Sequence, residues 1–226
     1  MVHVAKLNFN GDPNVGLRAL ATDKFCLIGR DVPEKYDAKL EEVLGVPLIR
    51  TNLYNTPLVG IFAVANSTHL FVPDIIFKSE LENLKVKLKK HNIKIITLKT
   101  DHTALSNSIV LNDKICFTST LIETQVIEAI KNTGLEVFQT DLAETKVPGS
   151  LGILTNKGAI FAPNLSDPEI KLIEKALGFE IGLGTVNMGN PFLSSGIIAN
   201  SNGFIIGSLS SGPEIARIDE ALGFLK

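Results

Sequence analysis

The segment DEALGFLK, residues 219–226, repeats the earlier segment EKALGFEI, residues 174–181, and this repetition decides the fold. A short polar turn between two apolar runs recurs along the whole chain. The first residues of these turns are Thr22, Asn66, Asn112, Asn156 and Asn200, so neighbouring turns lie 44 to 46 residues apart. A chain of 226 residues therefore accommodates about five such units. A period of this length is typical of repeat proteins and propellers, in which each unit buries apolar surface against its neighbours.

Each unit is predicted to contain two strands, a helix and a third strand. The turns join runs rich in β-branched and aromatic residues, such as GILT (152–155) and AIFAP (159–163), which indicate antiparallel hairpins. Asparagine is favoured in the turns because its side chain bonds nearby backbone and because it tolerates left-handed geometry. Helices are clearest in SDPEIKLIEKALG (166–178) and SSGPEIARIDEALG (210–223), where serine and proline mark the start and glycine marks the end.

Two further helices are predicted to begin with capping boxes, in which a hydroxyl side chain and a glutamate three residues later bond each other's backbone N–H groups. The pairs are Ser79 with Glu82 and Thr120 with Glu123. The remaining helix is predicted over YDAKLEEVLG, ending at Gly45. An extended stretch follows each of the first four helices: VPLIRT (46–51), IKIITL (93–98), LEVFQT (135–140) and FEIGLGT (179–185).

The fifth unit lacks a third strand because the sequence stops at Lys226, whereas residues 2–9, VHVAKLNF, are extended with no helix before them. We expect residues 2–9 to supply the missing strand, which closes the array and leaves no open sheet edge. The predicted fold is therefore a closed, five-bladed, pseudosymmetric α/β propeller, and such a ring favours a monomer. The single domain, 1–226, divides approximately into units 14–57, 58–104, 105–148, 149–192 and 193–226, with 2–9 as the closing strand. A doubly wound sheet is the alternative, but hairpins joined by tight turns disfavour it.

Composition and charge argue against several classes of protein. The net charge of −2 gives no sign of the general basic surface with which proteins bind nucleic acid phosphates. The sequence contains no apolar run of roughly 18 residues and no signal-peptide pattern at its start, so we expect a cytoplasmic protein without membrane association. Two cysteines suggest neither a disulfide framework nor a metal site.

Residues suited to catalysis do not cluster in the sequence. Cys26 and Cys116 take the same position in their units as Leu70, Ile160 and Phe204, which indicates a buried strand position and not a reactive thiol. No histidine is spaced for metal binding, and no dinucleotide, Walker or hydrolase motif is present. We therefore expect no enzyme activity, cofactor or metal.

A small, polar or proline-bearing segment precedes the first strand of every unit, and pseudosymmetry places all five segments at one end of the ring axis. The segments are PNVG (13–16), TPLVG (56–60), TALSN (103–107), VPGS (147–150) and NPFLSS (190–195). Small residues there are explained by close packing around the axis. The functional interpretation is a nearly flat face, interrupted by Leu58, Pro148 and Phe192, that docks on a broad partner.

The sequence resembles the translation initiation factor 6 family of archaea and eukaryotes over essentially its whole length. The resemblance is carried by VGIFAVANSTHLFVP (59–73), TALSNSIVLND (103–113), VPGSLGILTNKGAIFAP (147–163) and GTVNMGN (184–190). It implies a ring of the pentein type, which agrees with the repeat analysis. The eukaryotic members carry an additional C-terminal tail, so this sequence, which stops at the fifth helix, is similar to the archaeal form.

The resemblance also implies a non-catalytic factor that binds the large ribosomal subunit on its subunit-joining face and sterically blocks the small subunit. The implied neighbours are ribosomal protein uL14, a uL24-type protein and the sarcin–ricin loop, and release is associated with a translocation-type GTPase and the Shwachman–Bodian–Diamond protein. The family's asparagine in the A-L-x-N motif, implicated in the uL14 contact, matches Asn107. The residues predicted to bind the ribosome are Asn107, Asn14, Leu58, Ile61, Pro148, Ser150, Phe192 and Ser194.

Two alternative functions remain open from the sequence. Pentein-type amidine-modifying enzymes place a cysteine, a histidine and two carboxylates around the central channel, and rapid labelling of Cys26 or Cys116 in the native protein would indicate such a site. The other alternative is ribosomal RNA binding through the basic run KVKLKKHNIK (85–94), which would make binding strongly dependent on salt.

Overall fold

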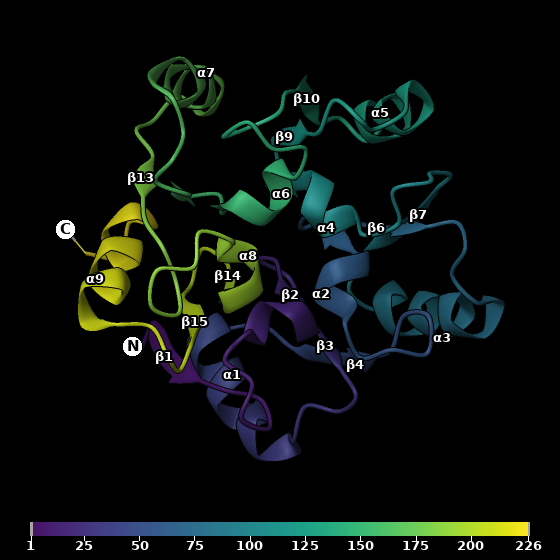
Figure 1. Ribbon diagram of the computed structural model, residues 1–226. Helices are drawn as coiled ribbons and strands as arrows, with labels where there is room; N and C mark the ends of the chain where they lie inside the picture. Colours follow the sequence, from purple (N-terminus) through teal and green to yellow (C-terminus); the bar gives the residue numbers. More distant parts are fainter. Residues whose placement is uncertain (1, 226) are drawn as a thin grey trace.

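The computed structural model describes residues 2–225, so Met1 and Lys226, the ends of the predicted domain, lie outside the description. Within residues 2–225 the strands form five three-stranded sheets. Each sheet combines an antiparallel hairpin with a third strand that runs parallel to the second. Figure 1 shows the long helices at the periphery and the shortest helices nearer the centre. The predicted mixed α/β fold of five repeated units is therefore confirmed.

The elements recur in the same order in every unit. The first strands are β2 (Ala19–Ala21), β5 (Val64–Ala65), β8 (Ile109–Leu111), β11 (Gly152–Leu154) and β14 (Ile197–Ala199). The second strands are β3 (Cys26–Gly29), β6 (His69–Pro73), β9 (Ile115–Thr118), β12 (Ala159–Phe161) and β15 (Phe204–Gly207). The long helices are α1 (Asp37–Leu44), which follows the 3₁₀ turn η2 (Glu34–Tyr36), α3 (Lys78–Lys89), α5 (Thr124–Lys131), α7 (Asp167–Leu177) and α9 (Gly212–Ala221). The third strands are β4 (Leu48–Thr51), β7 (Lys94–Leu98), β10 (Glu136–Gln139), β13 (Gly182–Leu183) and β1 (Val4–Leu7).

The N-terminal strand completes the last sheet, as the sequence predicts. Strand β1 pairs in parallel with β15, from Val4 opposite Phe204 to Leu7 opposite Gly207. Just before β1, His3 Nε2 lies 2.9 Å from a carboxylate oxygen of Asp219 on α9. The first and last parts of the chain are thereby joined by a sheet ladder and a polar side-chain contact, and Figure 1 shows N and C on the same side of the molecule.

A single helical turn precedes the first strand of every unit, and the sequence analysis did not predict it. These turns are η1 (Val15–Arg18), α2 (Val59–Phe62), α4 (Leu105–Ser108), α6 (Pro148–Leu151) and α8 (Leu193–Gly196). Four residues cover about one turn of helix, so they cannot show the 3.6-residue periodicity by which a helix is recognised in a sequence.

The ends of the long helices agree with the sequence only in part. Capping boxes at Ser166 and Ser211 and the left-handed Gly45 and Gly178 confirm the predicted ends of α7, α9 and α1. The predicted box of Ser79 with Glu82 is wrong, because α3 has Phe77 as its N-cap and Glu82 pairs with Lys85 instead.

The predicted box of Thr120 with Glu123 is wrong as well. Glu123 is itself the N-cap of α5, and its carboxylate accepts bonds from Thr100 Oγ1 and the Asp101 N–H. Thr120 bonds Asp141 instead. Glu123 therefore stabilises the loop that leads into the short helix α4, through contacts between segments distant in the sequence.

The hairpin turns are held by side-chain acceptors. Asn66 Oδ1, for example, accepts bonds from the N–H groups of Thr68 and His69. In the fourth unit the acceptor is the Thr155 hydroxyl, so the predicted turn residue, Asn156, is wrong by one position. For the same reason the strand residue equivalent to Cys26 is Ala159 and not Ile160, as the sequence analysis predicted. The described turn acceptors have negative φ, so hydrogen bonding, and not tolerance of left-handed geometry, explains the asparagines.

Apolar side chains are buried between neighbouring units and not within single ones. One cluster combines Val64 and Phe71 of the second unit with Ile109, Cys116 and the buried residues of α5 in the third. The four other clusters of described residues join units in the same way. A unit of this kind cannot bury its apolar surface alone, which is the general property of repeat proteins. No helix within residues 2–225 has the length and apolar character needed to cross a membrane.

We predict that His3→Ala lowers the free energy of unfolding by about 1–3 kcal/mol, because it leaves the buried Asp219 carboxylate without its partner. Urea unfolding followed by circular dichroism measures the difference. Val2→Ala is the matched control, since Val2 is 45% exposed. Equal stability of His3→Ala and Val2→Ala would show that the contact does not hold the closing strand.

Candidate functional site

The short helices lie side by side around the centre of the molecule. Helix η1 touches α2, α2 touches α4, α4 touches α6, α6 touches α8, and α8 touches η1. We call this end of the molecule the rim face, and we include in it the loops that lead into the short helices and the loops that follow the second strands. Figure 1 shows the short helices near the centre of the molecule, surrounded by the long helices at the periphery.

Glycines allow the short helices to approach one another this closely. A Cβ atom on Gly60 would lie 1.9 Å from the backbone oxygen of Gly16, and one on Gly16 would lie 2.0 Å from that of Ser194. Gly149 has the same relation to Ser106, at 2.2 Å. Close packing therefore accounts for the small residues of the rim segments, while the surface that these helices expose remains available for binding.

A cavity of about 110 Å³ lies at the centre, lined by the short helices and the first strands. Its described lining consists of glycine, alanine, serine and aliphatic residues, with no cysteine, histidine or carboxylate. Cys26 and Cys116 are fully buried elsewhere, and burial raises the pKa of both thiols to about 12. The arrangement of nucleophile, histidine and carboxylates that an amidine-modifying enzyme needs is therefore not found among the residues that line this cavity.

The predicted site residues all lie on or beside the short helices, in four kinds of position. Asn14, Leu58 and Phe192 precede η1, α2 and α8 as their N-cap residues. Ile61, Asn107 and Ser150 are the third residues of α2, α4 and α6, Pro148 begins α6, and Ser194 is the second residue of α8. The structure thus gathers all eight predicted residues at the rim face.

Their exposure differs more than the sequence analysis expected. Phe192 is 45% exposed, and Leu58 is half-buried. Pro148, which was predicted to interrupt the flat face, is buried, and Ser150 is only 8% exposed. The close approach of α6 to α4 covers these two residues. Ser194 lines the central cavity.

Asn107 has a defined orientation on α4. Its side-chain oxygen accepts a hydrogen bond of 3.1 Å from the Ser150 hydroxyl on α6. The bond joins equivalent positions of neighbouring units, and it leaves the amide nitrogen of the half-buried Asn107 as a donor without a partner in residues 2–225. Asn107 can therefore present a hydrogen-bond donor at a fixed place on the rim face.

Exposed apolar side chains on the loops of the rim face were missed by the sequence analysis. Ile75, Leu121 and Leu209 follow the second strands of three units and are 52%, 46% and 53% exposed. Met188 is 77% exposed in the loop before α8. A comparison of the loops after the second strands could have found the first three. Each directly precedes the residue whose backbone N–H closes its loop.

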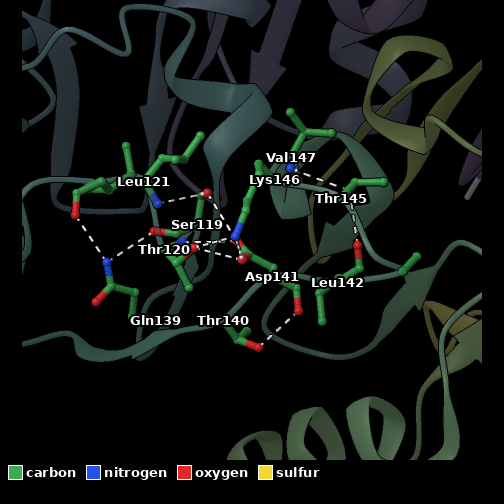
Figure 2. Close-up of polar contacts among 12 residues, drawn as sticks. Ser119, Thr120, Leu121, Gln139, Thr140, Asp141, Leu142, Thr145, Lys146 and Val147 are labelled. Atoms are coloured by element: carbon green, nitrogen blue, oxygen red, sulfur yellow. Dashed lines mark hydrogen bonds and ion pairs between the residues drawn. The ribbon is translucent and has the colours of Figure 1, made fainter.

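A polar network orders the rim face of the third unit, between the loop after β9 and the loop that leads into α6 (Figure 2). Asp141, after β10, accepts bonds from the Thr120 hydroxyl at 2.6 Å, from the Thr120 N–H at 3.0 Å and from Lys146 Nζ. Partial burial alone would raise the pKa of Asp141, but the bonds from Lys146 and Thr120 lower it to about 2. Leu121, which is labelled beside this network, is thereby held in an ordered loop.

The opposite end of the molecule, the turn end, carries its own polar contacts. The Asn156 amide donates to a carboxylate oxygen of Asp23 and one of Asp113, each at 2.8 Å. The basic run 85–94 also reaches this end, since the Lys94 N–H donates to the Thr68 oxygen in a hairpin turn. The basic run is therefore separate from the rim face.

Five α/β units of this kind, with a broad rim of short helices and without a catalytic cluster in the described cavity, define a repeat protein whose candidate site is a docking surface. The chain belongs to the eIF-6 family, whose model matches residues 4–221. It is 37% identical over 227 residues to translation initiation factor 6 of Thermococcus onnurineus, covering 99% of this chain and 100% of the relative. It is similar to the factors of the same name from Thermococcus kodakarensis, at 39% over 229 residues, and Pyrococcus abyssi, at 34% over 227 residues, again over 99% of this chain and 100% of each relative.

We predict that Gly60→Ala lowers the free energy of unfolding by roughly 2 kcal/mol or more, because the added methyl group would collide with the backbone of η1. Gly212→Ala is the control, since a Cβ atom there meets nothing within 4 Å. Thermal unfolding of the two variants measures the effect. A Gly60→Ala protein as stable as the control would mean that the short helices are less tightly packed than the structure shows.

Asp141 is expected to make stability fall in acid. Because its pKa is lower in the folded protein, about 2, than the ordinary value of 3.8, its stabilising contribution is complete above about pH 4 and is lost as the pH falls towards 2. Asp141→Asn should remove roughly 1–2 kcal/mol at pH 7 and flatten the stability profile between pH 4 and 2. Urea unfolding at a series of pH values tests this, and parallel profiles for the variant and the parent protein would contradict it.

Proposed function

We propose that this protein binds the large ribosomal subunit through its rim face and sterically prevents association with the small subunit. Family membership supports a role in translation initiation, because the similar archaeal proteins carry the name translation initiation factor 6. The observation that carries the choice of surface is the position of Asn107. The residue matched to the family's A-L-x-N motif lies on α4, one of the short helices of the rim face, and its amide nitrogen has no hydrogen-bond partner within residues 2–225.

The proposal includes a closed propeller of the pentein type, formed by a single domain of five units. Its support is that the first strands also contact one another in a cycle, β2 with β5, β5 with β8, β8 with β11, β11 with β14, and β14 with β2. A closed arrangement of rigid units gives a broad face a fixed shape. A partner can then bind it without a large loss of conformational freedom.

The character of the rim face suits a macromolecular partner. Its loops present exposed Phe192, Met188 and Leu121, and the polar Asn107 lies on the same face; phenylalanine and methionine are enriched at protein interfaces. In line with the resemblance, we propose uL14 as the protein that contacts Asn107, with a uL24-type protein and the sarcin–ricin loop as neighbours. Release by a translocation-type GTPase with the Shwachman–Bodian–Diamond protein is part of the same proposal.

The mechanism would be competition at equilibrium, with no chemical step. A contact of roughly 1,600 Å² in total is ordinary for a specific protein complex. A bound factor that covers the joining surface weakens the apparent association of the subunits by the factor 1 + [L]/Kd, where [L] is the concentration of the free factor and Kd is its dissociation constant. The proposed mechanism therefore requires only that the factor binds the large subunit and is large enough to block the small subunit.

Sedimentation with separated archaeal ribosomal subunits tests the proposal. The protein should migrate with the large subunit in a sucrose gradient and should reduce the peak of joined ribosomes in proportion to its concentration. A protein that stays at the top of the gradient and leaves subunit joining unchanged would overturn the proposal.

We predict that Asn107→Ser weakens binding to the large subunit by about tenfold or more, the loss expected for a residue central to an interface. The thermal midpoint should change little, because the serine removes only the single bond from Ser150. Two controls separate the causes: Ser150→Ala breaks the same bond but keeps Asn107, and Lys114→Ala changes an exposed residue at the turn end. Binding lost equally in Ser150→Ala, which keeps the Asn107 amide, would show that the affinity does not depend on the free amide of Asn107 alone.

A further inference from the structure

One junction between units differs from the other four. At four junctions the third strand of a unit packs against the long helix of the next: β4 on α3, β7 on α5, β13 on α9 and β1 on α1. At the junction of the third and fourth units, β10 and α7 contact each other less closely, and a groove of about 560 Å³ lies between them, above the apolar cluster that they share (Figure 1). This groove lies at the periphery of the molecule, away from the short helices of the rim face.

One wall of the groove is the edge of a sheet. Strand β10 is the outermost strand of its sheet, in the order β10-β9-β8. The N–H groups of Glu136 and Thr140 donate to β9 and to the residues flanking it, at 2.9 and 2.8 Å. Because the direction of bonding alternates along a strand, Val137 and Gln139 point their backbone N–H and C=O groups out of the sheet at its edge, beside Glu136 and Phe138, which line the groove. Such an edge offers a template on which another strand can pair.

The other wall is an apolar stripe on α7. Pro168, Leu172 and Ala176 follow one another at four-residue intervals on the same side of the helix, facing Phe138 of β10 across the groove. Leu172 is 41% exposed although it lies on the wall of a groove. Among the residues of α7, only Ile173 is fully covered by the rest of the described chain. Residues 2–225 therefore leave Pro168 and Leu172 exposed, while Ala176 is partly buried against the core cluster at the base of the groove.

Two positive charges flank the stripe. Lys171 and Lys175 lie one helical turn apart in the wall of the groove, and both are exposed. Neither makes an ion pair within residues 2–225, although Glu136 lies in the opposite wall and other lysines on the helices, such as Lys39 and Lys131, pair with a glutamate three residues away. The groove thus combines free backbone groups, an apolar stripe and a local excess of positive charge.

We propose that this groove binds an extended segment of a partner protein with alternating apolar and acidic residues, which adds a strand to β10. Main-chain bonds to Val137 and Gln139 would supply affinity for any extended peptide. The alternation follows from strand geometry, because successive side chains of the bound peptide point in opposite directions. Apolar side chains of the peptide would cover Leu172 and Ala176, and its acidic side chains would reach Lys171 and Lys175. A nucleic acid would use the lysines but would leave the apolar stripe and the strand edge unpaired, so the three features together favour a peptide.

Selection from a displayed library of random ten-residue peptides, against the full-length protein, tests the proposal. Peptides that alternate apolar and acidic residues should be enriched, and fluorescence anisotropy of a labelled, enriched peptide then gives its affinity. Leu172→Asp, and separately the double change Lys171→Glu with Lys175→Glu, should each weaken binding at least about tenfold. Val86→Asp is the matched control, because Val86 is 75% exposed on another long helix, and it should leave the affinity unchanged.

A second measurement addresses the strand edge directly. The bound peptide should protect the backbone N–H groups of Val137 and Gln139 from hydrogen exchange, and Val137→Pro, which removes one outward donor, should weaken binding without loss of a sheet bond. The proposal is overturned if no peptide is enriched, if enriched peptides bind Leu172→Asp as tightly as the parent protein, or if neither N–H group is protected. Two other outcomes also overturn it. In one, the changes at Leu172 or the lysines leave peptide binding intact but abolish self-association measured by size-exclusion chromatography. In the other, they leave peptide binding intact but abolish binding of an RNA oligonucleotide.

Discussion

The parallel pairing of β1 with β15 is the constraint on which the rest of the structure depends. Every apolar cluster among the described residues lies between units, so each unit is stable only while both neighbours are in place. The pairing unites the fifth unit with the first and places Ala5 of β1 in the same cluster as Ile205 of β15 and Val43 of α1. Without it, two units would each lose a neighbour, and the third strand of the last sheet would be missing. The contact of His3 with Asp219 adds a polar bond at the same place.

The rim face is a consequence of that arrangement. Once the first strands surround the centre, the short helices before them must crowd together, and the glycines at positions such as Gly16 and Gly60 are the residues that make this crowding possible. The same crowding buries Pro148 and Ser150 and fixes the side chain of Asn107. The loops of the rim face stay exposed and carry Phe192, Met188 and Leu121. Packing and binding are therefore not competing explanations of the rim segments, because the side chains that pack and those that are exposed come from different positions of the same segment.

Departures from the symmetry of the units are informative for the same reason. If all five junctions were closed by a helix against the neighbouring strand, the periphery would offer no open sheet edge. The gap between β10 and α7 is the departure, and it exposes Leu172 and leaves Lys171 and Lys175 without acidic partners in the described chain. The hydrogen bond from Ser150 to Asn107 joins the same two units at the rim face, whereas a groove lies between β10 and α7 at the periphery. The polar network of Asp141, Thr120 and Lys146 orders the rim loops of the third unit (Figure 2). The structure thus separates a rigid face at the axis from a groove at the side.

The sequence by itself determined the number of units, the order of hairpin, helix and third strand, and the use of residues 2–9 to complete the last sheet, because these depend on local patterns that recur with a fixed period. It also placed Asn107, Leu58 and Phe192 at one end of the molecule, since pseudosymmetry carries equivalent positions to equivalent places. Only the tertiary structure decided the partners of Glu123 and Thr120, the replacement of Asn156 by Thr155 as a turn acceptor, the burial of Pro148 and the gap beside β10. The hydroxyl of the turn acceptor Thr155 bonds Lys157 and Gly158 within its own turn, but the other features depend on contacts between segments far apart in the chain. A single turn of helix such as α4 is in addition too short to leave a periodic pattern that a sequence can reveal.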